Sequence, residues 1–597
     1  MEQQLWLSPE WINLLHYYPD RWTESGYLSQ VDDPRFFNAD DGVKNPRSEM
    51  LATLAAFYQR DTRANDHPLC FFPARLQWLS EHLMIDRKTL PKVECNDYIE
   101  WRKIVQAQQV SLIFPTYHLN SPSSMFGHTL LRLDRTAGNN NSKWLSFAVN
   151  FGANVRAVDN SLLYAVKGLT GGYPGIFIVT PYYNKIREYN RIEKRDIWEY
   201  RLNLTPAEVE RMVVHLWELK EVNFDYYFFD ENCSYRLLEL LEVARPGLEL
   251  TDQFGVTAIP IDTVKAIEAA GLIEETTFRP SQITQLKGLL AQLSLEEQDY
   301  FEQLTTDMAT IESSGFMALA TDRRQKIIDA AYRYQRHQQV GKVRDDTLAK
   351  QSHSLLRLLN EYPPDKTPIT VATPVPPERG HHSRRVSLGI GERNEQTYQE
   401  LSMRMAFHSL EDNGYGFLRG AHINMANIQL QANNETNKVK LQRLDVIDIF
   451  SLTPRSRYFQ PTSWRVYTGL ERQMTDGVDR LASHVTAGAG PAYKLLDDVI
   501  VYALGTGRIE YNRGFSGNRL KLAIGAASGI LWHIGSMTSR IELAGEKFSN
   551  GNYRSRLLLR HNIPLATNHA LHLSITGENH TSDRFVDAAI AYRYHFR

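Results

Sequence analysis

The C-terminal part of the chain alternates between apolar and polar residues with a period of two. In the last segment, from Phe585 to Phe596, one face is apolar and the other is more polar. The first face consists of Val586, Ala588, Ile590, Tyr592, Tyr594 and Phe596, and the second of Phe585, Asp587, Ala589, Ala591, Arg593 and His595. Because successive side chains of a β-strand point to opposite sides, this pattern predicts a strand between two different environments.

About twelve such segments, each of about ten residues, follow one another after residue 380 and are separated by Asn, Gly, Asp and Ser turns. They predict a closed antiparallel transmembrane β-barrel of about 12 strands, with apolar side chains toward lipid and charged ones toward the lumen. A soluble β-sandwich would also alternate and is the alternative. The long run of consecutive strands with tyrosine-rich ends favours the membrane barrel.

The N-terminal part has a different pattern. Residues 1–105 have apolar side chains at helical spacing, and residues 106 to about 200 contain short strand-like runs such as 110–114 and 129–133. A helix is predicted to begin after Thr205, with Thr205 as its N-cap, Pro206 at the first position and Glu208 reaching back. Helical patterns then continue to about residue 360.

Six prolines between residues 361 and 380 predict a stiff, extended linker. The chain is therefore expected to be multidomain, with an α+β part followed by an all-β part. The predicted segments are a helical domain at 1–105, a mixed domain at 106–285, a helical segment at 286–360, the linker at 361–380 and the barrel at 381–597.

Charge and the start of the chain narrow the class of protein. Sixty-seven basic residues face 69 acidic ones, which argues against a nucleic-acid partner held by a global basic field. No secretory signal is visible in residues 1–7, and no apolar run reaches the length of a transmembrane helix. Taken alone this indicates a cytosolic protein, but a membrane barrel requires export. We therefore expect an export signal that was removed or lies outside this chain.

The chain has three cysteines, Cys70, Cys95 and Cys233. In an exported protein Cys70 and Cys95, which lie 25 residues apart in one N-terminal segment, are the natural disulfide pair. Cys233 would then be a free thiol. The same spacing is equally compatible with three reduced, buried cysteines.

Cys233 has the surroundings of a reactive thiol. It follows an acidic and polar turn at 228–232 and precedes an apolar run at 237–241, which places it at or next to a helix N-terminus. The unpaired N–H groups and the dipole at a helix start lower a thiol pKa and can stabilise an oxyanion. His128, about a hundred residues earlier at the head of a strand-like segment, could accept the thiol proton.

The histidine precedes the cysteine, which is the order found in circularly permuted papain-like folds. Five segments between roughly residues 105 and 280 resemble the Lnb N-terminal periplasmic domain family. They are Ser124–Arg132, Asn150–Ala153, Gly171–Tyr173, Arg195–Tyr200 and Asp230–Tyr235. The family is similar to permuted NlpC-type and lecithin:retinol acyltransferase-like thiol enzymes.

The resemblance implies a permuted papain-like catalytic domain with Cys233 as nucleophile and His128 as base. Asn150, on the strand after the histidine strand, is the predicted third residue, which would orient the imidazole ring. Supporting positions are Asn232, Tyr226, Tyr227, Ser124 and Gly127. Gly171 and Gly172 lack the lysine and hydroxyl of a P-loop and instead indicate either backbone flexibility or a close approach beside the site. The spacing of histidines and acids does not match a zinc site, and neither a metal nor a cofactor is expected.

The namesake of the family is a lipoprotein intramolecular acyltransferase, which moves an acyl chain from the lipid glycerol to an N-terminal cysteine amine. That protein is anchored by transmembrane helices, which this chain lacks, whereas Gram-negative proteins with the domain often carry a C-terminal barrel. The resemblance implies a periplasmic cysteine acyltransferase or hydrolase anchored in the outer membrane. Its partners would be outer-membrane lipid and a lipoprotein, phospholipid or peptidoglycan substrate, cleaved through a thioester. The alternative is an outer-membrane channel or secretion protein whose papain-like domain is a non-catalytic binding module.

Overall fold

The computed structural model of the chain describes residues 4–597 apart from 61–63, 118–124, 136–145, 155–166, 169, 341, 344, 363–368, 370, 476–477, 516 and 582. The chain folds into two compact units, Met1–Pro374 and Val375–Arg597. The division falls inside the proline-rich segment 361–380. Within the described ranges, none of the helices combines the length and the apolar character needed to cross a bilayer.

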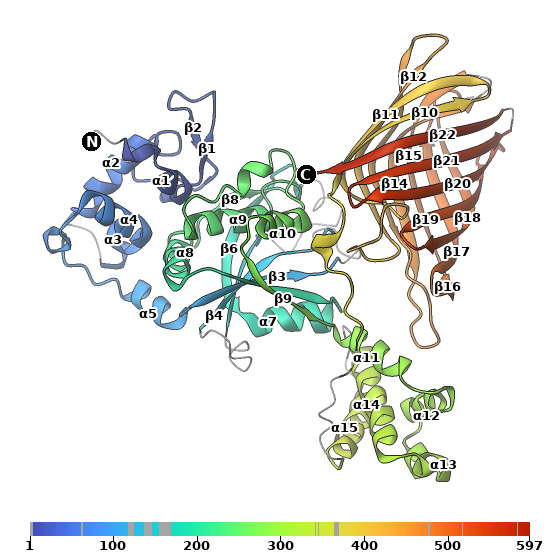
Figure 1. Ribbon diagram of the computed structural model, residues 1–597, viewed down its shortest axis with the longest axis horizontal. Helices are drawn as coiled ribbons and strands as arrows, with labels where there is room; N and C mark the ends of the chain where they lie inside the picture. Colours follow the sequence, from blue (N-terminus) through green and yellow to red (C-terminus); the bar gives the residue numbers. More distant parts are fainter. Residues whose placement is uncertain are drawn as a thin grey trace. The chain divides into compact units, whose positions relative to one another are not determined.

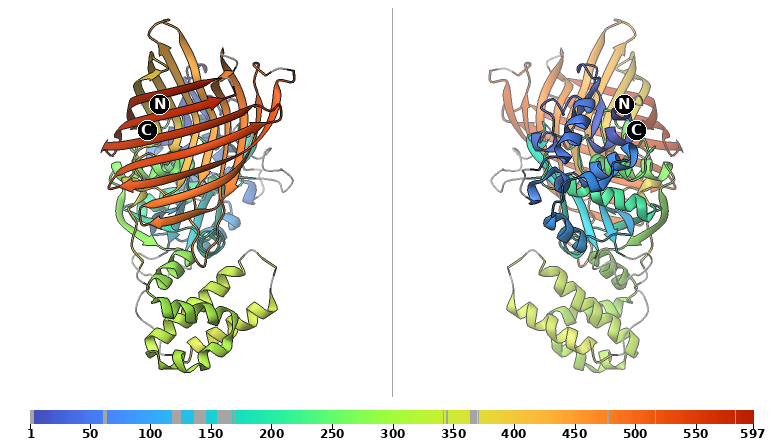
Figure 2. Two further views of the ribbon diagram at one scale, coloured as in Figure 1. Left: turned by 90° about the vertical axis from the view of Figure 1, so that its right-hand side faces the viewer. Right: turned by 90° about the vertical axis from the view of Figure 1, so that its left-hand side faces the viewer.

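The second unit is a closed antiparallel barrel of 12 strands, shown in yellow to red in Figures 1 and 2. Each strand pairs with its neighbours in the chain, and β22 pairs with β10 to close the wall. The short β16 (Ala492–Leu496) follows β15 and pairs with the start of β17. The wall strands are β10 (Arg384–Arg393), β11 (Gln396–His408), β12 (Ala421–Asn433), β13 (Val439–Ser451), β14 (Ser463–Thr475), β15 (Val478–Gly490), β17 (Val499–Tyr511), β18 (Leu520–Ile534), β19 (Met537–Phe548), β20 (Tyr553–Ala566), β21 (His569–His580) and β22 (Arg584–Phe596).

The side chains of the barrel alternate as the sequence predicts. In β22 the even-numbered residues 586–594 are exposed and the odd-numbered residues 585, 587, 591, 593 and 595 are buried. Aliphatic side chains elsewhere on the outer face are also open to the surroundings, with Ile390 63% and Ile524 76% exposed. An outer surface this rich in exposed aliphatic residues fits lipid rather than water. The membrane barrel is therefore confirmed, and the two-sheet sandwich is not the fold of this region.

The two ends of the barrel differ in their connections. β10 begins and β22 ends at the same end, where residues 409–420 join β11 to β12 and residues 452–462 join β13 to β14. At the other end the longest connection is 512–519, and others are as short as 394–395 and 581–583. Outer-membrane barrels usually have their short turns on the periplasmic side. Here the longer connections share an end with both termini of the unit.

Residues 409–420, which we call the inward loop, lie across the inside of the barrel. Glu411 contacts arginines on β19 and β20, and Asp412 contacts arginines on β10, β11 and β22. Leu410 packs in a cluster with residues of β13, β17 and β18. These contacts reach strands on several sides of the wall, so the loop narrows the lumen at this end.

The first unit is built around an antiparallel sheet of seven strands in the order β8-β6-β5-β4-β3-β7-β9. Helix α7 and the π-helix η6 pack on one face through a cluster that includes Leu130, Ala148 and Tyr182. On the other face Arg236 of helix α9 lies over Phe151 of β5. The strands are β3 (Gln109–Pro115), β4 (Leu130–Asp134), β5 (Phe147–Ala153), β6 (Tyr173–Pro181), β7 (Ile197–Leu202), β8 (Phe224–Tyr226) and β9 (Ile273–Arg279).

Helices flank this sheet in the chain. The elements within and directly after it are α7 (Tyr182–Ile186), η6 (Arg187–Ile192), α8 (Pro206–Glu218), α9 (Cys233–Ala244), η7 (Thr251–Gln253) and α10 (Pro260–Ala269). Helix α8 begins with the predicted capping box, in which Thr205 Oγ1 accepts from the Glu208 N–H and the Glu208 carboxylate accepts from the Thr205 N–H. The sequence patterns did not separate α7 and η6 from the strand region, or β8 and β9 from the helical region. All four elements are short, and β8 and β9 lie at the sheet edges.

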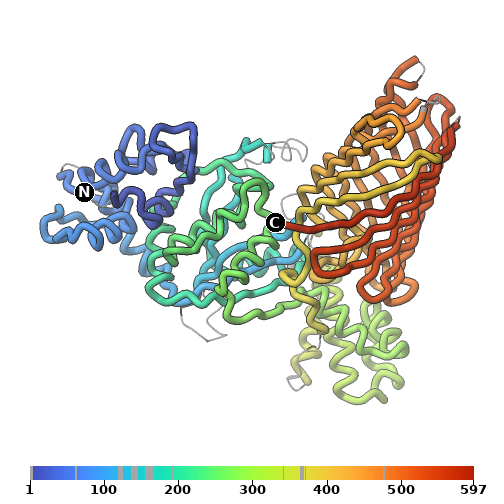
Figure 3. Tube along the Cα trace, turned by 45° about the horizontal axis from the view of Figure 1, so that its top comes forward, coloured from blue at the N-terminus to red at the C-terminus, as the bar shows by residue number. Residues whose placement is uncertain are grey.

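The N-terminal helices are joined by a disulfide. Cys70 at the end of α3 is bonded to Cys95, and Cys233 is a free thiol. The bridge fits an oxidising compartment. The elements are η1 (Leu5–Leu7), α1 (Pro9–Leu14), β1 (Tyr17–Pro19), β2 (Tyr27–Ser29), η2 (Pro34–Phe36), α2 (Pro46–Phe57), η3 (Ala64–Asp66), α3 (Pro68–Phe71), α4 (Pro73–Leu83), η4 (Arg87–Thr89) and α5 (Asn96–Ile104). Together they form the blue part of the tube in Figure 3.

A helical bundle, yellow-green in Figure 3, follows β9. Its core includes Leu286, Phe301, Ile327 and Leu355, which come from four of its helices. The elements are α11 (Gln282–Ala291), α12 (Leu295–Thr306), η8 (Met308–Glu312), α13 (Ser314–Ala318), α14 (Thr321–Gln338) and α15 (Asp346–Leu359), with η9 (Pro377–Arg379) just before the barrel.

Candidate active site

Cys233 is the first residue of α9, as the sequence predicts. Asn232 is the N-cap, and its Oδ1 accepts from the backbone N–H groups of Ser234 (2.9 Å) and Tyr235 (3.3 Å). The Asn232 Nδ2 donates to the backbone carbonyl of Ala258 at 2.7 Å. Asn232 is itself buried, so it fixes the start of the helix against the segment that precedes α10. Its contacts position the cysteine without touching the sulfur.

His128 lies two residues before β4, next to a glycine whose backbone conformation is specific. Gly127 has a φ of 91°, a conformation in which side chains are strained. A Cβ at this position would also lie 2.6 Å from the ring of Phe114. The chain therefore needs a glycine to pass Phe114 and place His128 just before the start of β4, the central strand of the sheet.

The three predicted catalytic side chains meet in one hydrogen-bonded row. The Cys233 Sγ lies 3.0 Å from His128 Nδ1, and His128 Nε2 lies 2.6 Å from Asn150 Oδ1. Asn150 comes from β5, the strand next to β4, and Cys233 comes from the helix over the sheet. The sheet and one helix thus bring together residues separated by 105 positions in the chain.

The row defines which nitrogen of His128 carries the proton. An amide oxygen only accepts hydrogen bonds, so Nε2 must donate to Asn150. In the neutral ring Nδ1 then has a lone pair directed at the thiol. This is the tautomer that a base acting on Cys233 needs.

Burial sets the protonation state of the pair. It raises the pKa of the Cys233 thiol to about 11, although N–H and hydroxyl donors act in the opposite direction. It also lowers the pKa of His128 to about 3, against the hydrogen bond that the ring donates to Asn150, and the positive charges of Arg195 and Lys185 add to the lowering. The sequence led us to expect a thiol pKa lowered by the helix start. Desolvation outweighs that effect, so thiol and imidazole are both neutral near pH 7.

Donors for a developing negative charge surround the sulfur. The backbone N–H and the hydroxyl of Thr129, and the backbone N–H groups of Ser234 and Cys233, all favour the thiolate. The last two belong to the first turn of α9, where N–H groups lack partners within the helix. N–H groups at a helix start can also donate to the oxyanion that forms on the carbonyl oxygen of an attacked acyl group. Thr129 was not among the predicted site residues, although it directly follows His128.

A small pocket opens beside the thiol. It is lined by Phe126, Gly127, Tyr226, Phe228 and Pro260 together with Asn232 and Cys233. Its volume of about 10 Å³ is close to that of one water-sized sphere. An acyl group can therefore enter only if the aromatic side chains that line it move apart.

Only some of the other predicted site residues line this pocket. Tyr226 lines the pocket and stacks on Phe151 with ring centroids 5.8 Å apart. Tyr227 does not line it, but its ring would lie 2.4 Å from a Cβ on Gly171, which has a φ of 72°. This is the close approach, one of the two alternatives for the Gly171–Gly172 pair. Ser124 lies outside the described residues. Tyr189, which was not predicted, contributes a ring 6.0 Å from that of His128.

A buried ionic cluster lies behind the site, between the N-terminal helices and α8 and α9. On α9, Arg236 Nη1 contacts Glu239 at 2.9 Å, and Arg236 Nη2 contacts Glu231 of the turn before Cys233. His16, which follows α1, contacts Glu239 at 3.0 Å and the ring of His215 on α8 at 3.1 Å. Helix α9 is therefore tied to the N-terminal helices by buried polar contacts.

The cluster continues to the helix α4. Arg75 Nη1 lies 2.9 Å from Glu49 of α2, and its Nε lies 3.5 Å from Glu218 of α8. We call the whole set the junction cluster; it consists of His16, Glu49, Arg75, His215, Glu218, Glu231, Arg236 and Glu239. Two arginines thus share four carboxylates and two histidines.

Among the described residues, one group of side chains has the spacing of a metal site. Ligand atoms of His381, Asp412 and His595 all lie within 4.8 Å of one another. However, Asp412 already accepts from Arg404 at 2.6 Å and lies 3.3 Å from Arg593. A divalent cation would have to sit beside these guanidinium groups, so the residues do not suit a metal.

The part of the chain that contains the candidate site matches a known protein family. Residues 97–270 match the family model of the Lnb N-terminal periplasmic domain. We call residues 97–270 the Lnb domain, after the family model that they match. The family resemblance suggested by the sequence motifs is therefore confirmed. His128, Asn150 and Cys233 all lie within the matched residues of the Lnb domain.

The other parts of the chain match three family models, each described as a domain of unknown function. DUF7843 matches residues 3–82, DUF7842 matches residues 276–363 and DUF7840 matches residues 374–595. The last of these covers the barrel. No curated protein matches the chain significantly.

Solved structures resemble the barrel part at low identity. A KdgM porin is 10% identical over 36% of this chain and 99% of that chain, with a TM-score of 0.22. The outer membrane phospholipase A from Escherichia coli is 8% identical over 36% of this chain and 98% of that chain, with a TM-score of 0.23. The lipid-facing barrel and the Lnb domain together identify an outer-membrane protein with a periplasmic domain.

Proposed function

We propose that the Lnb domain is a cysteine-dependent acyltransferase or hydrolase that works through a thioester on Cys233. The observation that carries the proposal is the row of contacts from Cys233 Sγ to His128 Nδ1 (3.0 Å) and from His128 Nε2 to Asn150 Oδ1 (2.6 Å). A free thiol with a base of fixed tautomer is the arrangement that nucleophilic catalysis requires.

In the first half of the reaction, the sulfur attacks the acyl carbon while His128 Nδ1 takes the thiol proton. Because thiol and imidazole are both neutral at rest, the proton moves during the attack rather than before it. The N–H groups at the start of α9 and the hydroxyl of Thr129 stabilise the negative charge that develops. His128 then gives the proton to the leaving oxygen or nitrogen, and a thioester remains on Cys233.

In the second half, an amine or a water molecule attacks the thioester. His128 accepts a proton from this nucleophile and returns it to the departing sulfur, which restores the thiol. An amine acceptor gives an acyl transfer and water gives a hydrolysis. The pocket of Phe126, Tyr226, Phe228 and Pro260 offers an apolar wall to the acyl group.

The barrel favours a substrate that is located at the membrane. It holds the Lnb domain at the periplasmic side of the outer membrane, where lipoproteins, phospholipids and the peptidoglycan stem peptide are within reach. All three classes contain ester or amide carbonyls that a thiol can attack. A thioester enzyme anchored at this surface could act on any of them.

Mass spectrometry of cells that carry either the wild-type protein or Cys233→Ala tests the proposal. We expect one class of lipid, lipoprotein or stem peptide to change its acylation or cleavage only when Cys233 is present. The control is that the variant keeps its Cys70–Cys95 disulfide and the heat-dependent gel shift of a folded barrel. Identical lipid, lipoprotein and peptidoglycan profiles in the two strains would contradict the proposal.

The alternative of a channel with a non-catalytic domain has less support. The inward loop narrows the lumen, and its two carboxylates are held by arginines from five strands. If the alternative held, Cys233→Ala would leave all profiles unchanged while solute uptake through reconstituted barrels would be measurable.

A further inference from the structure

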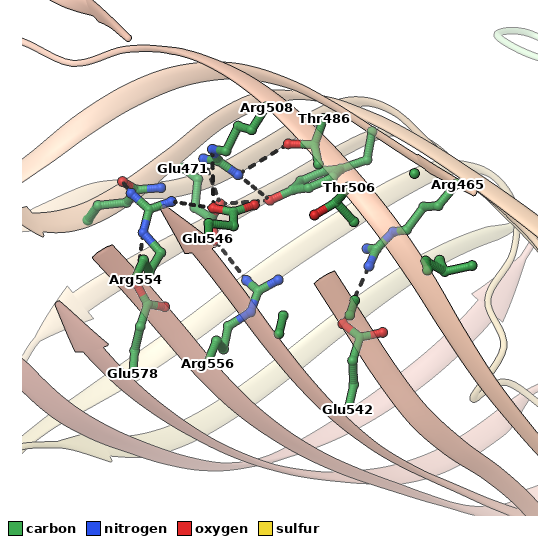
Figure 4. A pocket seen from close by; sticks show the side chains of 16 residues that line it. Arg465, Glu471, Thr486, Thr506, Arg508, Glu542, Glu546, Arg554, Arg556 and Glu578 are labelled. Atoms are coloured by element: carbon green, nitrogen blue, oxygen red, sulfur yellow. Dashed lines mark hydrogen bonds and ion pairs between the residues drawn. The ribbon is translucent and has the colours of Figure 1, made fainter. Parts of the chain in front are cut away.

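Charged side chains fill the barrel lumen in two clusters that differ in their balance. Figure 4 shows the first, in which Arg508, Arg554 and Arg556 converge on Glu471, Glu546 and Glu578. Opposite charges also face each other across the strands here, with Glu546 paired to Arg554 and Arg556 paired to Glu578. Each arginine of this cluster has a carboxylate within ion-pair distance. We call it the balanced cluster.

The second cluster lies near the inward loop and has an excess of positive charge. Five guanidinium groups meet three carboxylates: those of Glu411 and Asp412, and that of Glu542, which lies 3.8 Å from Arg540. Glu411 Oε1 lies 2.9 Å from Arg540 and 3.4 Å from Arg560. Asp412 lies 2.6 Å from Arg404, 3.4 Å from Arg385 and 3.3 Å from Arg593. We call the set Arg385, Arg404, Arg540, Arg560 and Arg593 the arginine cluster.

The strand register places like charges opposite one another in the arginine cluster. Arg385 of β10 is the direct cross-strand neighbour of Arg404 of β11, and Arg540 of β19 is that of Arg560 of β20. Like charges at such positions destabilise a sheet. Arginine cannot relieve the repulsion by losing its proton. The excess charge therefore calls for a counter-charge that the nearby carboxylates do not supply.

Several donors in this cluster have no protein partner. Among the described residues, the Nε atoms of Arg385, Arg540 and Arg593 and the Nδ1 of His572 are buried without a hydrogen bond. All four side chains line a cavity of about 180 Å³, large enough for several water molecules or one tetrahedral oxyanion. Each of these residues is more than nine-tenths buried. Buried donors on charged groups are costly when left unpaired.

Another carboxylate on the wall, that of Glu400, is already engaged by other side chains. Glu400 lines the same cavity, four residues along β11 from Arg404, and its Oε2 accepts from the amides of Gln429 (2.6 Å) and Gln431 (3.0 Å). It makes no ion pair with the arginine cluster within the described part of the chain. The part of the cavity that the arginine cluster lines therefore combines excess positive charge, free donors and space.

We propose that the arginine cluster is a binding site for a phosphate-type oxyanion inside the barrel lumen. The free guanidinium N–H groups of Arg385, Arg540 and Arg593 would donate to the anion, and the His572 ring would add one more donor. Arginine is suited to this role because its planar group makes strong, charge-assisted bonds to phosphate oxygens. This site is independent of Cys233 and of the proposed reaction.

Inorganic phosphate binding to the full-length protein in detergent tests the proposal. At constant ionic strength, adjusted with chloride, phosphate should raise the temperature of the barrel's heat-dependent gel shift in a saturable way. Arg593→Gln should weaken the apparent phosphate affinity at least about tenfold, because it removes a charge-assisted donor. Without phosphate this variant should be at least as heat-resistant as the wild type, since it removes a repelling charge while Asp412 keeps Arg404.

Arg554→Gln in the balanced cluster is the matched control. It removes an arginine of the same lumen that has carboxylate partners, so it should lower the gel-shift temperature and leave the phosphate affinity unchanged. Equal loss of the phosphate effect in the two variants, or no effect in the wild type, would overturn the proposal. Equilibrium dialysis of labelled phosphate needs no variant and should give saturable binding near one per chain; its absence would overturn the proposal as well.

Discussion

The junction cluster and the arginine cluster both bury ionisable side chains, but their charges are unbalanced in opposite directions. In the junction cluster two arginines share four carboxylates and two histidines. In the arginine cluster five arginines share three carboxylates. The first cluster can adjust its charge by taking up protons. Burial already raises the pKa of Glu231 to about 7, against the effect of Arg236.

Arginines have no such adjustment. A guanidinium group keeps its proton in a protein, so excess charge remains unless an ion from outside compensates it. The kind of residue in excess therefore decides whether a buried cluster needs a counter-ion from outside the protein. A cluster with excess carboxylates can be a self-contained structural element, whereas one with excess arginines points to a ligand.

Arg236→Met should change the stability of the junction cluster more than any other variant proposed below. The change leaves Glu231 and Glu239 without their guanidinium partner, which should cost about 3–5 kcal/mol of stability at pH 8. The cost should be smaller at pH 6, because the unpaired carboxylates then acquire raised pKa values and bind protons in the folded state. Urea unfolding followed by tryptophan fluorescence measures this, since eight of the ten tryptophans precede residue 375.

Glu239→Gln in the same chain provides the control for Arg236→Met. The double variant should regain part of the lost stability, since one unpaired charge is gone. A loss that is the same at both pH values and is not recovered in the double variant would mean that packing, rather than charge, governs the junction cluster.

A smaller effect is expected at Asn150, a neutral residue whose single hydrogen bond orients His128. Asn150→Ala should lower kcat roughly tenfold to a hundredfold with little change in KM, as typically happens when a second-layer orienting group is removed. Asn150→Asp should restore most of the activity and move the acidic limb of the pH profile to higher pH. The carboxylate favours the imidazolium form and so raises the pKa of His128. An unchanged kcat in Asn150→Ala would remove Asn150 from the mechanism.

The smallest effect is a pH dependence of stability that arises from Cys233 and His128. The pKa of Cys233 is raised to about 11 from an ordinary 9.0, so its contribution to stability is complete below pH 9 and is lost as the pH rises through 11. The pKa of His128 is lowered to about 3 from 6.5, so its contribution is complete above pH 6.5 and is lost as the pH falls toward 3. Both contributions are present together between pH 6.5 and 9.

Iodoacetamide labelling reports the same protonation states, because Cys233 is the free thiol of the chain. Labelling of the resting protein should be slow at pH 7 and should keep rising above pH 9. A plateau reached below pH 7 would show a thiolate–imidazolium pair instead. The unfolded protein serves as the reference for an ordinary thiol.

Much of the barrel could be predicted because one physical rule repeats along it. Each strand has one face toward lipid and one toward the lumen, so the period of two is visible in every segment, as in β22. The inward loop could not be predicted, since Leu410, Glu411 and Asp412 have no periodic pattern. Its position depends on arginines more than a hundred residues away in the chain, such as Arg540 and Arg593.

The site residues that could be predicted are those with a recognisable sequence context. Cys233 follows a capping residue and precedes an apolar run, and His128 stands at a strand head, so both stood out in the sequence. The thiol pKa was not predictable, because desolvation depends on how Phe126, Tyr226 and Phe228 close over the sulfur. The junction cluster was also invisible, since His16 meets α9 only in the folded unit.

The short connections at one end of the barrel have a consequence for the cell surface. The Lnb domain is joined to the end that carries the long loops, so the opposite end, with its brief turns, is the one presented outside the cell. Antibodies and bacteriophages recognise outer-membrane proteins through the loops that protrude from the cell surface. This barrel protrudes little, and we expect it to be a poor receptor and a weak antigen.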